Sequence, residues 1–261
     1  MSERVGGTVP SGPIIDKPAD LAGLLTNLEQ GDVLFIDEIH RLQKSVEEYL
    51  YAAMEDFRLD IVIDSGVSAR SVRIDLPKFT LIGSTTREGL LAAPFRARFG
   101  VMEKLDYYPP DELRTIVLRS AGILGIKVDQ AGATAIARRA RGTPRLANRF
   151  LRRLRDFAQV AGRQTIDAEA AESGLKRLGI DDTGLDALDR RILTCILNQG
   201  GGPVGLKTIA VSVGEEESTI EEVYEPFLIQ TGMLHKTPRG RVATEKAAAH
   251  IKVLPPSGGL F

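Results

Sequence analysis

The sequence contains a single cysteine, Cys195, and no run of eighteen apolar residues. One cysteine excludes an internal disulfide and is typical of a reducing compartment. The lack of a long apolar run predicts no membrane-spanning helix, and the first residues lack the apolar segment of a secretory signal. No internal repeat and no low-complexity tract is visible. These absences predict a soluble, cytoplasmic protein.

A further absence concerns nucleotide binding. The string Gly-x4-Gly-Lys-Ser/Thr, the P-loop whose backbone amides hold phosphates, does not occur in the 261 residues. Gly12-Pro13 and Lys17 lie close together but have the wrong spacing. Two explanations stay open: the chain is a fragment, or it has lost this contact with phosphate.

The composition provides enough apolar residues, 43%, for real cores, and the length allows two or three domains. The net charge of −1 says nothing about a polyanionic partner, but the charge is locally uneven. Residues 138–155 hold eight arginines and no acidic residue. A solvated helix face is the ordinary interpretation of such a run.

The most informative motif is the run Val33-Leu34-Phe35-Ile36-Asp37-Glu38. Four apolar residues predict a short buried strand, and two carboxylates follow where it ends. Ligands of open parallel sheets bind beyond that end of the strands, where Asp37 can hold hydrated Mg²⁺ and Glu38 can orient an attacking water. This is the Walker B pattern of a nucleotide-driven ATPase. The alternative is a buried strand that ends in a solvated acidic turn.

Periodicity divides the chain into three parts. In the first, two buried strands separated by a helix indicate an α/β core, and the second strand ends in the polar run Ser84-Thr85-Thr86-Arg87. From Pro109 the pattern is wholly helical, with helix starts at Asp111, Asp129 and Asp167. The last part has three helices and a basic hairpin around Pro238-Arg239-Gly240, the pattern of a winged helix-turn-helix.

The elements expected from these patterns are the helices Asp20–Leu28, Gln43–Phe57, Leu188–Leu197, Leu206–Val213 and Ser218–Gln230, a helix that starts at Gly142-Thr143-Pro144-Arg145, the strand Phe79–Gly83, and a hairpin of Leu59–Ile63 with Ser71–Leu76.

Several further residues fit an ATPase site. Thr85 or Thr86 can contact a γ-phosphate or the attacking water. Arg98, in the run Pro94–Gly100 that also holds Arg96, can reach a neighbouring subunit's nucleotide. Arg145 stands at the start of the third helix of the helical part. Each is weak alone, but their order and spacing match Walker B, sensor 1, arginine finger and sensor 2 of the AAA+ ATPases.

The match extends to one AAA+ family. The segments that carry it are Ser11-Gly12-Pro13, Lys17–Ala22, Asp32–Leu42, Gly83–Arg87, Gly142–Arg145 and Lys236–Arg241. They closely resemble the RuvB family, over nearly the whole chain. The resemblance implies a homohexameric ring that uses ATP and Mg²⁺ to drive branch migration of Holliday junctions in DNA recombination and repair. It implies double-stranded DNA, RuvA and RuvC as partners.

The resemblance also implies the domains and the roles of single residues. It implies an AAA+ large domain over residues 1–106, a helical lid over residues 107–182 and a winged-helix DNA-binding domain over residues 183–261. The implied catalytic residues are Asp37 (also the metal ligand), Glu38, Thr85, Thr86, Arg98 and Arg145, and the implied nucleotide contacts are Glu55, Asp56, Phe57, Arg98, Tyr108 and Arg145. The family's P-loop and its adenine-contacting segment have no counterpart in this sequence.

Some of these residues have a plain structural alternative. Tyr108 can stack on the nucleotide base or pack as an aromatic hinge between core and lid. Three apolar residues of the hairpin, Leu59, Ile61 and Ile63, are expected to dock RuvA, unless this face covers the protein's own core. His40 would fit the Asp-Glu-x-His box of another helicase class, but the other motifs of that class are missing, so we interpret it as a helix-start residue.

The wing is expected to bind the DNA backbone through Lys236, Arg239 and Arg241. The acidic run Glu215-Glu216-Glu217 at the start of the preceding helix weakens any claim that this helix end touches DNA. Without a P-loop, the 261-residue chain by itself is not expected to hydrolyse ATP at a useful rate. The leading hypothesis is a branch-migration ATPase, and the alternative is an ATPase-inactive ring subunit or DNA-binding adaptor. A clamp loader or replication initiator is a third, weaker alternative.

Overall fold

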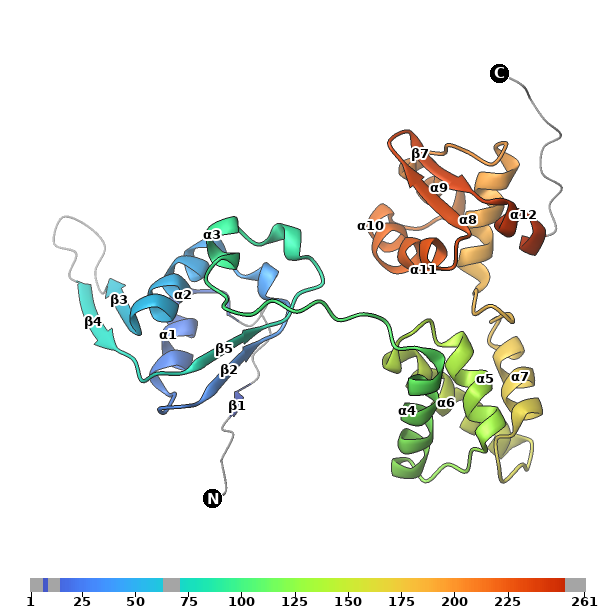
Figure 1. Cartoon of the computed structure of the whole chain (residues 1–261), viewed down its shortest axis with the longest axis horizontal. Helices are drawn as coiled ribbons and strands as arrows, with labels where there is room; N and C mark the ends of the chain where they lie inside the picture. The colour runs from blue at the N-terminus through green and yellow to red at the C-terminus, as the bar shows by residue number, and fades with distance from the viewer. Residues whose placement is uncertain (1–6, 9–14, 63–70, 252–261) are drawn as a thin grey trace. The chain divides into compact units, whose positions relative to one another are not determined.

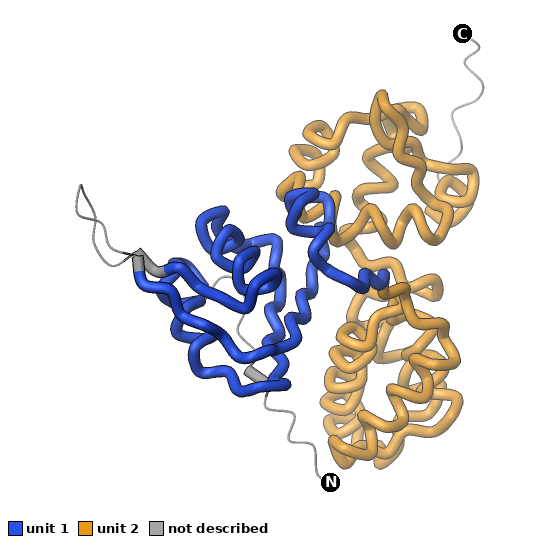
Figure 2. Tube along the Cα trace, turned by 60° about the vertical axis from the view of Figure 1, so that its left-hand side comes forward, with its two compact units in different colours: residues 1–104 blue, residues 105–261 orange. Residues whose placement is uncertain are grey.

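The computed structural model of the chain describes residues 7–8, 15–62 and 71–251 (Figure 1). The chain divides into two compact units, residues 1–104 and residues 105–261 (Figure 2). Among the described residues, no helix combines the length and the apolar character that crossing a bilayer requires.

A parallel sheet forms the centre of the first unit. Its strands are β1 (Gly7–Thr8), β2 (Val33–Ile36) and β5 (Thr80–Gly83), in the order β1-β2-β5. The register pairs the first residue of β2 with the first of β5 and the last with the last. The residues that follow β2 and β5 therefore leave the sheet side by side, as the sequence predicted for the acidic pair and the Ser-Thr-Thr run.

Helices α1 (Pro18–Thr26) and α2 (Lys44–Asp56) share one apolar core with this sheet. Val46, Leu50 and Ala53 recur along α2 at helical spacing and are fully buried, whereas several charged positions of the helix are exposed. The unit also contains the 3₁₀ turns η2 (Ile39–Arg41) and η3 (Glu88–Leu90) and the short helix α3 (Ala93–Arg96). The members of the core include Leu21, Leu25, Leu34, Ile36, Val46, Leu50 and Phe95.

The predicted hairpin is present as β3 (Arg58–Val62) and β4 (Ser71–Asp75), which pair antiparallel. Residues 63–70 lie outside the described part, and they include Ile63 and the predicted turn Asp64-Ser65-Gly66.

The second unit begins with four helices that surround their own apolar core. They are α4 (Pro110–Ile123), α5 (Gln130–Arg139), α6 (Pro144–Val160) and α7 (Ala168–Arg177). Asp129 and Asp167 cap α5 and α7 as predicted, since their carboxylates accept the backbone N–H groups of Gly132 at 2.6 Å and Ala170 at 2.8 Å.

A third apolar core holds the end of the chain together. Its elements are α8 (Ala187–Asn198), α9 (Leu206–Val213), α10 (Glu217–Thr219), the π-helical turn η4 (Ile220–Tyr224), α11 (Glu225–Gln230), and the hairpin of β6 (Leu234–Thr237) with β7 (Gly240–Ala243), followed by α12 (Glu245–Ile251). This is the predicted winged helix-turn-helix, with two differences. The third helix widens into a π turn just before Pro226, which has no N–H to donate to the preceding turn. Helix α12 was not predicted.

Candidate functional site

The ends of β2 and β5 bring together the carboxylates and hydroxyls that the sequence singled out. Asp37 follows β2 and is exposed, and Ser84 follows β5 beside it. The Ser84 backbone continues the ladder, because its N–H donates to the Ile36 carbonyl at 3.0 Å. The Ser84 hydroxyl donates to Asp37 Oδ1 in a short hydrogen bond. This bond fixes the rotamer of the carboxylate that would face a metal ion.

Glu38 has an unusual backbone conformation. Its φ of 53° and ψ of 47° are left-handed, a region that costs a residue with a side chain about 1–2 kcal/mol. The turn directs its carboxylate toward two polar neighbours: Oε2 lies 3.2 Å from His40 Nδ1 and 3.3 Å from Thr86 Oγ1. His40 Nδ1 also lies 2.8 Å from Thr85 Oγ1. Strain of this kind is found where a side chain must be aimed.

We refer to Asp37, Glu38, His40, Ser84, Thr85 and Thr86 as the catalytic edge. Four of these were predicted from the sequence, and the structure brings all four together. Ser84 and His40 were not assigned a site role. Ser84 could have been found from strand register alone, because the residue after Gly83 must lie beside Asp37. The contact between His40 and Thr85 depends on the η2 turn, which periodicity does not reveal.

The catalytic edge fits a Mg²⁺ ion that arrives with a nucleotide. Mg²⁺ usually keeps several waters and takes one or two protein ligands beside the phosphates. One oriented carboxylate, Asp37, with the adjacent Ser84 hydroxyl meets that need. Within the described residues, no group of three or more metal-binding side chains forms a complete protein cage.

Arg98, the predicted arginine finger, is held inside its own unit. Its Nη2 lies 2.8 Å from Glu55 Oε1, its Nη1 donates to the Pro94 carbonyl at 2.8 Å, and its Cζ lies 4.7 Å from the Tyr51 ring centre. Its Nε is buried and has no hydrogen-bond partner among the described residues. Glu55, a predicted nucleotide contact, is therefore the partner that orients Arg98.

The other two residues of that predicted contact, Asp56 and Phe57, end α2. Asp56 is exposed. Phe57 is left-handed, with φ of 52°, and packs edge-on against Phe79 with 5.8 Å between ring centres. Phe57 thus packs on the core beside β5 and is partly exposed.

Arg145 and Tyr108 belong to the second unit. Arg145 is exposed in the first turn of α6, and the Tyr108 ring is 44% exposed. The Tyr108 N–H donates to the Gly142 carbonyl at 2.9 Å. Gly142 is left-handed, and a Cβ there would come within 2.5 Å of the Tyr107 Cβ. The hydrogen bond between Tyr108 and Gly142 thus fixes the segment that enters the lid to the turn before Arg145. This arrangement is compatible with both interpretations of Tyr108.

The wing differs from its prediction at Arg241. This residue is only 9% exposed, and its guanidinium makes a two-pronged contact with the buried carboxylate of Glu225, at 2.5 and 3.1 Å. Such a group is not available to a phosphate. Lys236 is exposed but lies 2.7 Å from Glu221. Arg239 is exposed at the hairpin tip, and no ion pair forms with it among the described residues. Of the three predicted DNA contacts, Arg239 is the one that the geometry leaves open.

The hairpin also differs from its prediction at Leu59. The side chain is fully buried in the core of its own unit, so the alternative interpretation holds at this position. The side chains of Ile61 and Ile63 lie outside the description. Val72, the strand partner of Ile61, is 44% exposed.

Comparison with known sequences gives a consistent result along the whole chain. Three family models match in succession: "Holliday junction DNA helicase RuvB P-loop domain" over residues 3–105, "RuvB AAA lid domain" over residues 108–181 and "RuvB C-terminal winged helix domain" over residues 182–252. A Holliday junction branch migration complex subunit RuvB from Myxococcus xanthus is 59% identical over 261 residues, which covers 98% of this chain and 76% of the relative. The protein of the same name from Flavobacterium johnsoniae is also 59% identical, with coverages of 99% and 77%.

Solved structures agree with the sequences. The RuvB Holliday junction branch migration motor of Thermotoga maritima aligns with a TM-score of 0.83 at 47% identity, covering 96% of this chain and 79% of that one. A mutant of the same protein aligns with a TM-score of 0.84 at 48% identity, covering 95% and 80%.

Proposed function

The chain belongs to the RuvB family of AAA+ ATPases, and from this premise we propose that it is the motor subunit of Holliday junction branch migration. In this role it is an ATP-dependent DNA helicase that hydrolyses ATP with Mg²⁺ and drives duplex DNA through the junction. We place it in the cytoplasm, in a homohexameric ring that RuvA targets to junctions that RuvC resolves. The family match favours the motor over an ATPase-inactive subunit or adaptor.

The observation that carries this proposal is the catalytic edge. Asp37, oriented by the Ser84 hydroxyl, would bind the Mg²⁺ that comes with ATP. The ion supplies charge neutralisation for the transferred phosphoryl group. Glu38, which contacts Thr86 and His40, would orient the attacking water and accept its proton. Thr85 and Thr86 then serve as hydroxyl contacts to the γ-phosphate or to that water.

Two arginines complete the proposed chemistry. Arg98 is held by Glu55 and Tyr51 inside its own unit, so to contact a neighbouring subunit's nucleotide its guanidinium would exchange Glu55 for phosphate. In a ring it acts in trans on developing phosphate charge. Arg145 gives the lid a second positive contact, so that closure of the lid depends on the bound nucleotide.

The proposed DNA contact is the wing. A motor that moves along any duplex gains nothing from base-specific contacts, so we propose backbone contacts through Arg239, with Lys236 beside it. Lys236 would exchange Glu221 for phosphate, whereas Arg241 holds the wing in place through Glu225.

Branch migration is the test that separates a motor from an adaptor. Because the printed sequence holds no Gly-x4-Gly-Lys-Ser/Thr string, the assay uses this chain preceded by a family P-loop segment, which we call the completed chain. A motor converts a labelled synthetic four-way junction to duplex products with RuvA, Mg²⁺ and ATP, and not with a non-hydrolysable ATP analogue. An adaptor binds the junction equally in both conditions and produces no duplex products.

A further inference from the structure

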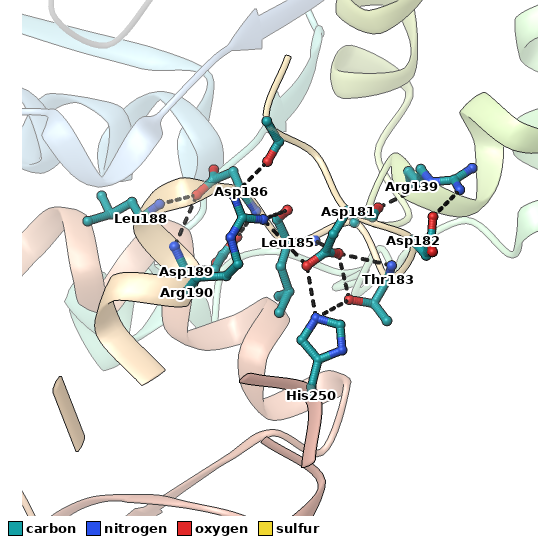
Figure 3. A network of polar contacts seen from close by, with 12 residues as sticks. Arg139, Asp181, Asp182, Thr183, Leu185, Asp186, Leu188, Asp189, Arg190 and His250 are labelled. Atoms are coloured by element: carbon teal, nitrogen blue, oxygen red, sulfur yellow. Dashed lines mark hydrogen bonds and ion pairs between the residues drawn. The ribbon is translucent and has the colours of Figure 1, made fainter. Parts of the chain in front are cut away.

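The lid and the winged helix are joined through a short polar segment, residues 181–186, which both domains grip (Figure 3). From the lid, Arg139 donates to Asp182 Oδ1 at 2.8 Å and to the Asp181 carbonyl at 3.2 Å. From the winged helix, His250 Nε2 lies 2.9 Å from Asp181 Oδ2. The segment is therefore anchored at the end of α5 and at α12, two elements that are far apart in the sequence.

Arg141 makes the most direct bridge between the two domains. It lies between α5 and α6, and its Nε donates to the Gly184 carbonyl at 3.0 Å. Its Nη2 lies 2.5 Å from Asp189 Oδ2 and 3.2 Å from Asp186 Oδ2, at the start of α8. Its Cζ stands 4.6 Å from the ring centre of Phe227 in α11. We call Arg141, Asp186, Asp189 and Phe227 the lid–wing clamp.

The burial of Asp189 makes this clamp specific. Its side chain is fully buried, and a buried carboxylate is costly unless a charged partner accompanies it. Arg141 is that partner, and it comes from the other domain. Any rotation of the lid against the winged helix would separate the pair and leave the Asp189 carboxyl buried without its hydrogen-bond donor. A buried pair adds little net stability, but the loss of one partner from it is strongly destabilising.

The position of Arg141 in the chain gives the clamp a link to the nucleotide. Arg141 is left-handed, with φ of 51°, and Gly142 follows with φ of 70°. These two residues set the turn that starts α6, where Arg145 lies. The residue that grips the winged helix is thus four residues from the one expected to sense ATP.

We propose that Arg141 is a positioning residue that makes the lid and the winged helix move as one body, so that a nucleotide-driven movement of the Arg145 turn is passed to the wing on the DNA. The inference has two parts. The locking part, that the lid and the winged helix are held together as one body, does not depend on the proposed function. The transmission part, that a nucleotide-driven movement is passed to the wing, rests on the proposed function.

The locking part is tested on the 261-residue chain by distance measurement between spin labels. Labels are attached at Gln159→Cys on the lid and Lys207→Cys on the winged helix, both exposed, in a Cys195→Ser background. The test variant is the double substitution Arg141→Gln with Asp189→Asn, which removes both charges and so avoids a stranded buried carboxylate. The matched control is Arg138→Gln, an exposed arginine at the end of α5, close to Arg141 in the chain.

We expect a single narrow distance distribution for the parent and for Arg138→Gln, and a broad one for the double variant, with unchanged helical circular dichroism. An unchanged narrow distribution in the double variant would overturn the proposal. A loss of helical circular dichroism in the double variant would overturn it as well, because the contact would then be needed for folding and would not be only a joint between two folded domains.

The transmission part is tested on the completed chain with RuvA and a four-way junction. Arg141→Lys keeps the charge but loses the guanidinium, which contacts Gly184 through Nε, Asp186 and Asp189 through Nη2, and the Phe227 ring through its face. We expect the number of junctions migrated per ATP hydrolysed to fall about fivefold while the ATPase rate stays within about twofold. An unchanged ratio would overturn transmission. If the parent itself shows no migration, the proposed function fails and the spin-label result still decides the locking.

Discussion

The catalytic edge and the lid–wing clamp are built alike and do opposite things. Each centres on a residue with a side chain in the left-handed region, Glu38 with φ of 53° and Arg141 with φ of 51°. At the catalytic edge the proposed metal ligand, Asp37, is exposed, whereas in the clamp Asp189 is fully buried against an arginine. An exposed oriented carboxylate retains capacity for a ligand. The groups of a buried pair bind each other and not a ligand, and this contact fixes the elements that carry them.

The largest effect should come from Arg98, which in a ring would act at the catalytic edge of a neighbouring subunit. In the completed chain, Arg98→Ala should reduce ATP turnover by about 10³-fold, because transition-state charge loses its partner. Nucleotide affinity should change little. Steady-state turnover and nucleotide titration measure the two, with Arg96→Ala as the matched control.

The action in trans has its own check. Mixing Arg98→Ala subunits with Glu38→Gln subunits should restore part of the activity at mixed interfaces. If mixed rings form and no activity returns, Arg98 does not act on a neighbour's nucleotide.

Two arginines of the wing, exposed Arg239 and buried Arg241, allow the same comparison between an exposed and a buried charged group. Arg241→Ala strands the buried carboxylate of Glu225 and should destabilise the winged helix by about 3 kcal/mol. Arg239→Ala should leave stability unchanged and reduce the slope of log affinity against log salt by about one. Urea unfolding and DNA titrations at several salt concentrations separate the two. The reverse pattern would mean that the roles are exchanged.

The clamp should also make the free energy of unfolding depend on pH. Burial raises the pKa of Asp189 to about 7, although Arg141 acts in the opposite direction. Since the folded state holds this proton more tightly than the unfolded chain, the resulting stability is present at low pH and is lost as pH rises toward about 7. Between about pH 5 and pH 8 the free energy of unfolding should fall by roughly 2 kcal/mol for this reason.

Asp189→Asn should flatten that part of the stability curve, measured by urea unfolding followed by circular dichroism. The exposed Glu172→Gln in the lid is the control. A curve that keeps its slope in Asp189→Asn would show that another group titrates.

The smallest effect should come from Ser84, which positions Asp37. Ser84→Ala removes the hydroxyl that orients the carboxylate, and turnover of the completed chain should fall about tenfold, in line with other residues that support a metal ligand. Raised Mg²⁺ should recover part of the loss. A loss that Mg²⁺ does not relieve would assign Ser84 a different role.

Most of the catalytic edge could be predicted because it depends on local patterns. An apolar run of four residues followed by carboxylates fixes a strand and its end, and parallel register brings the next strand's end beside it. The caps of α5 and α7 were predictable for the same reason, since an aspartate ahead of a helix acts within three residues.

The clamp and the wing pair could not be predicted, because their partners are distant. Asp189 lies 48 residues from Arg141, and Glu225 lies 16 residues from Arg241. In the sequence Arg241 is one more cation of a basic hairpin, and only packing shows that it is buried. The same holds for Leu59, whose alternating pattern does not tell which side of the hairpin faces the core.

The account depends most on Glu38, and the effect of its substitution on ATP turnover is the most direct test. ATP hydrolysis by the completed chain is measured with Mg²⁺, RuvA and a four-way junction, for the parent, Glu38→Gln and the exposed control Glu48→Gln. We expect Glu38→Gln to lower turnover by at least about 100-fold with ATP affinity retained, and Glu48→Gln to match the parent. Turnover by Glu38→Gln at the parent's rate would contradict the assignment of the catalytic edge.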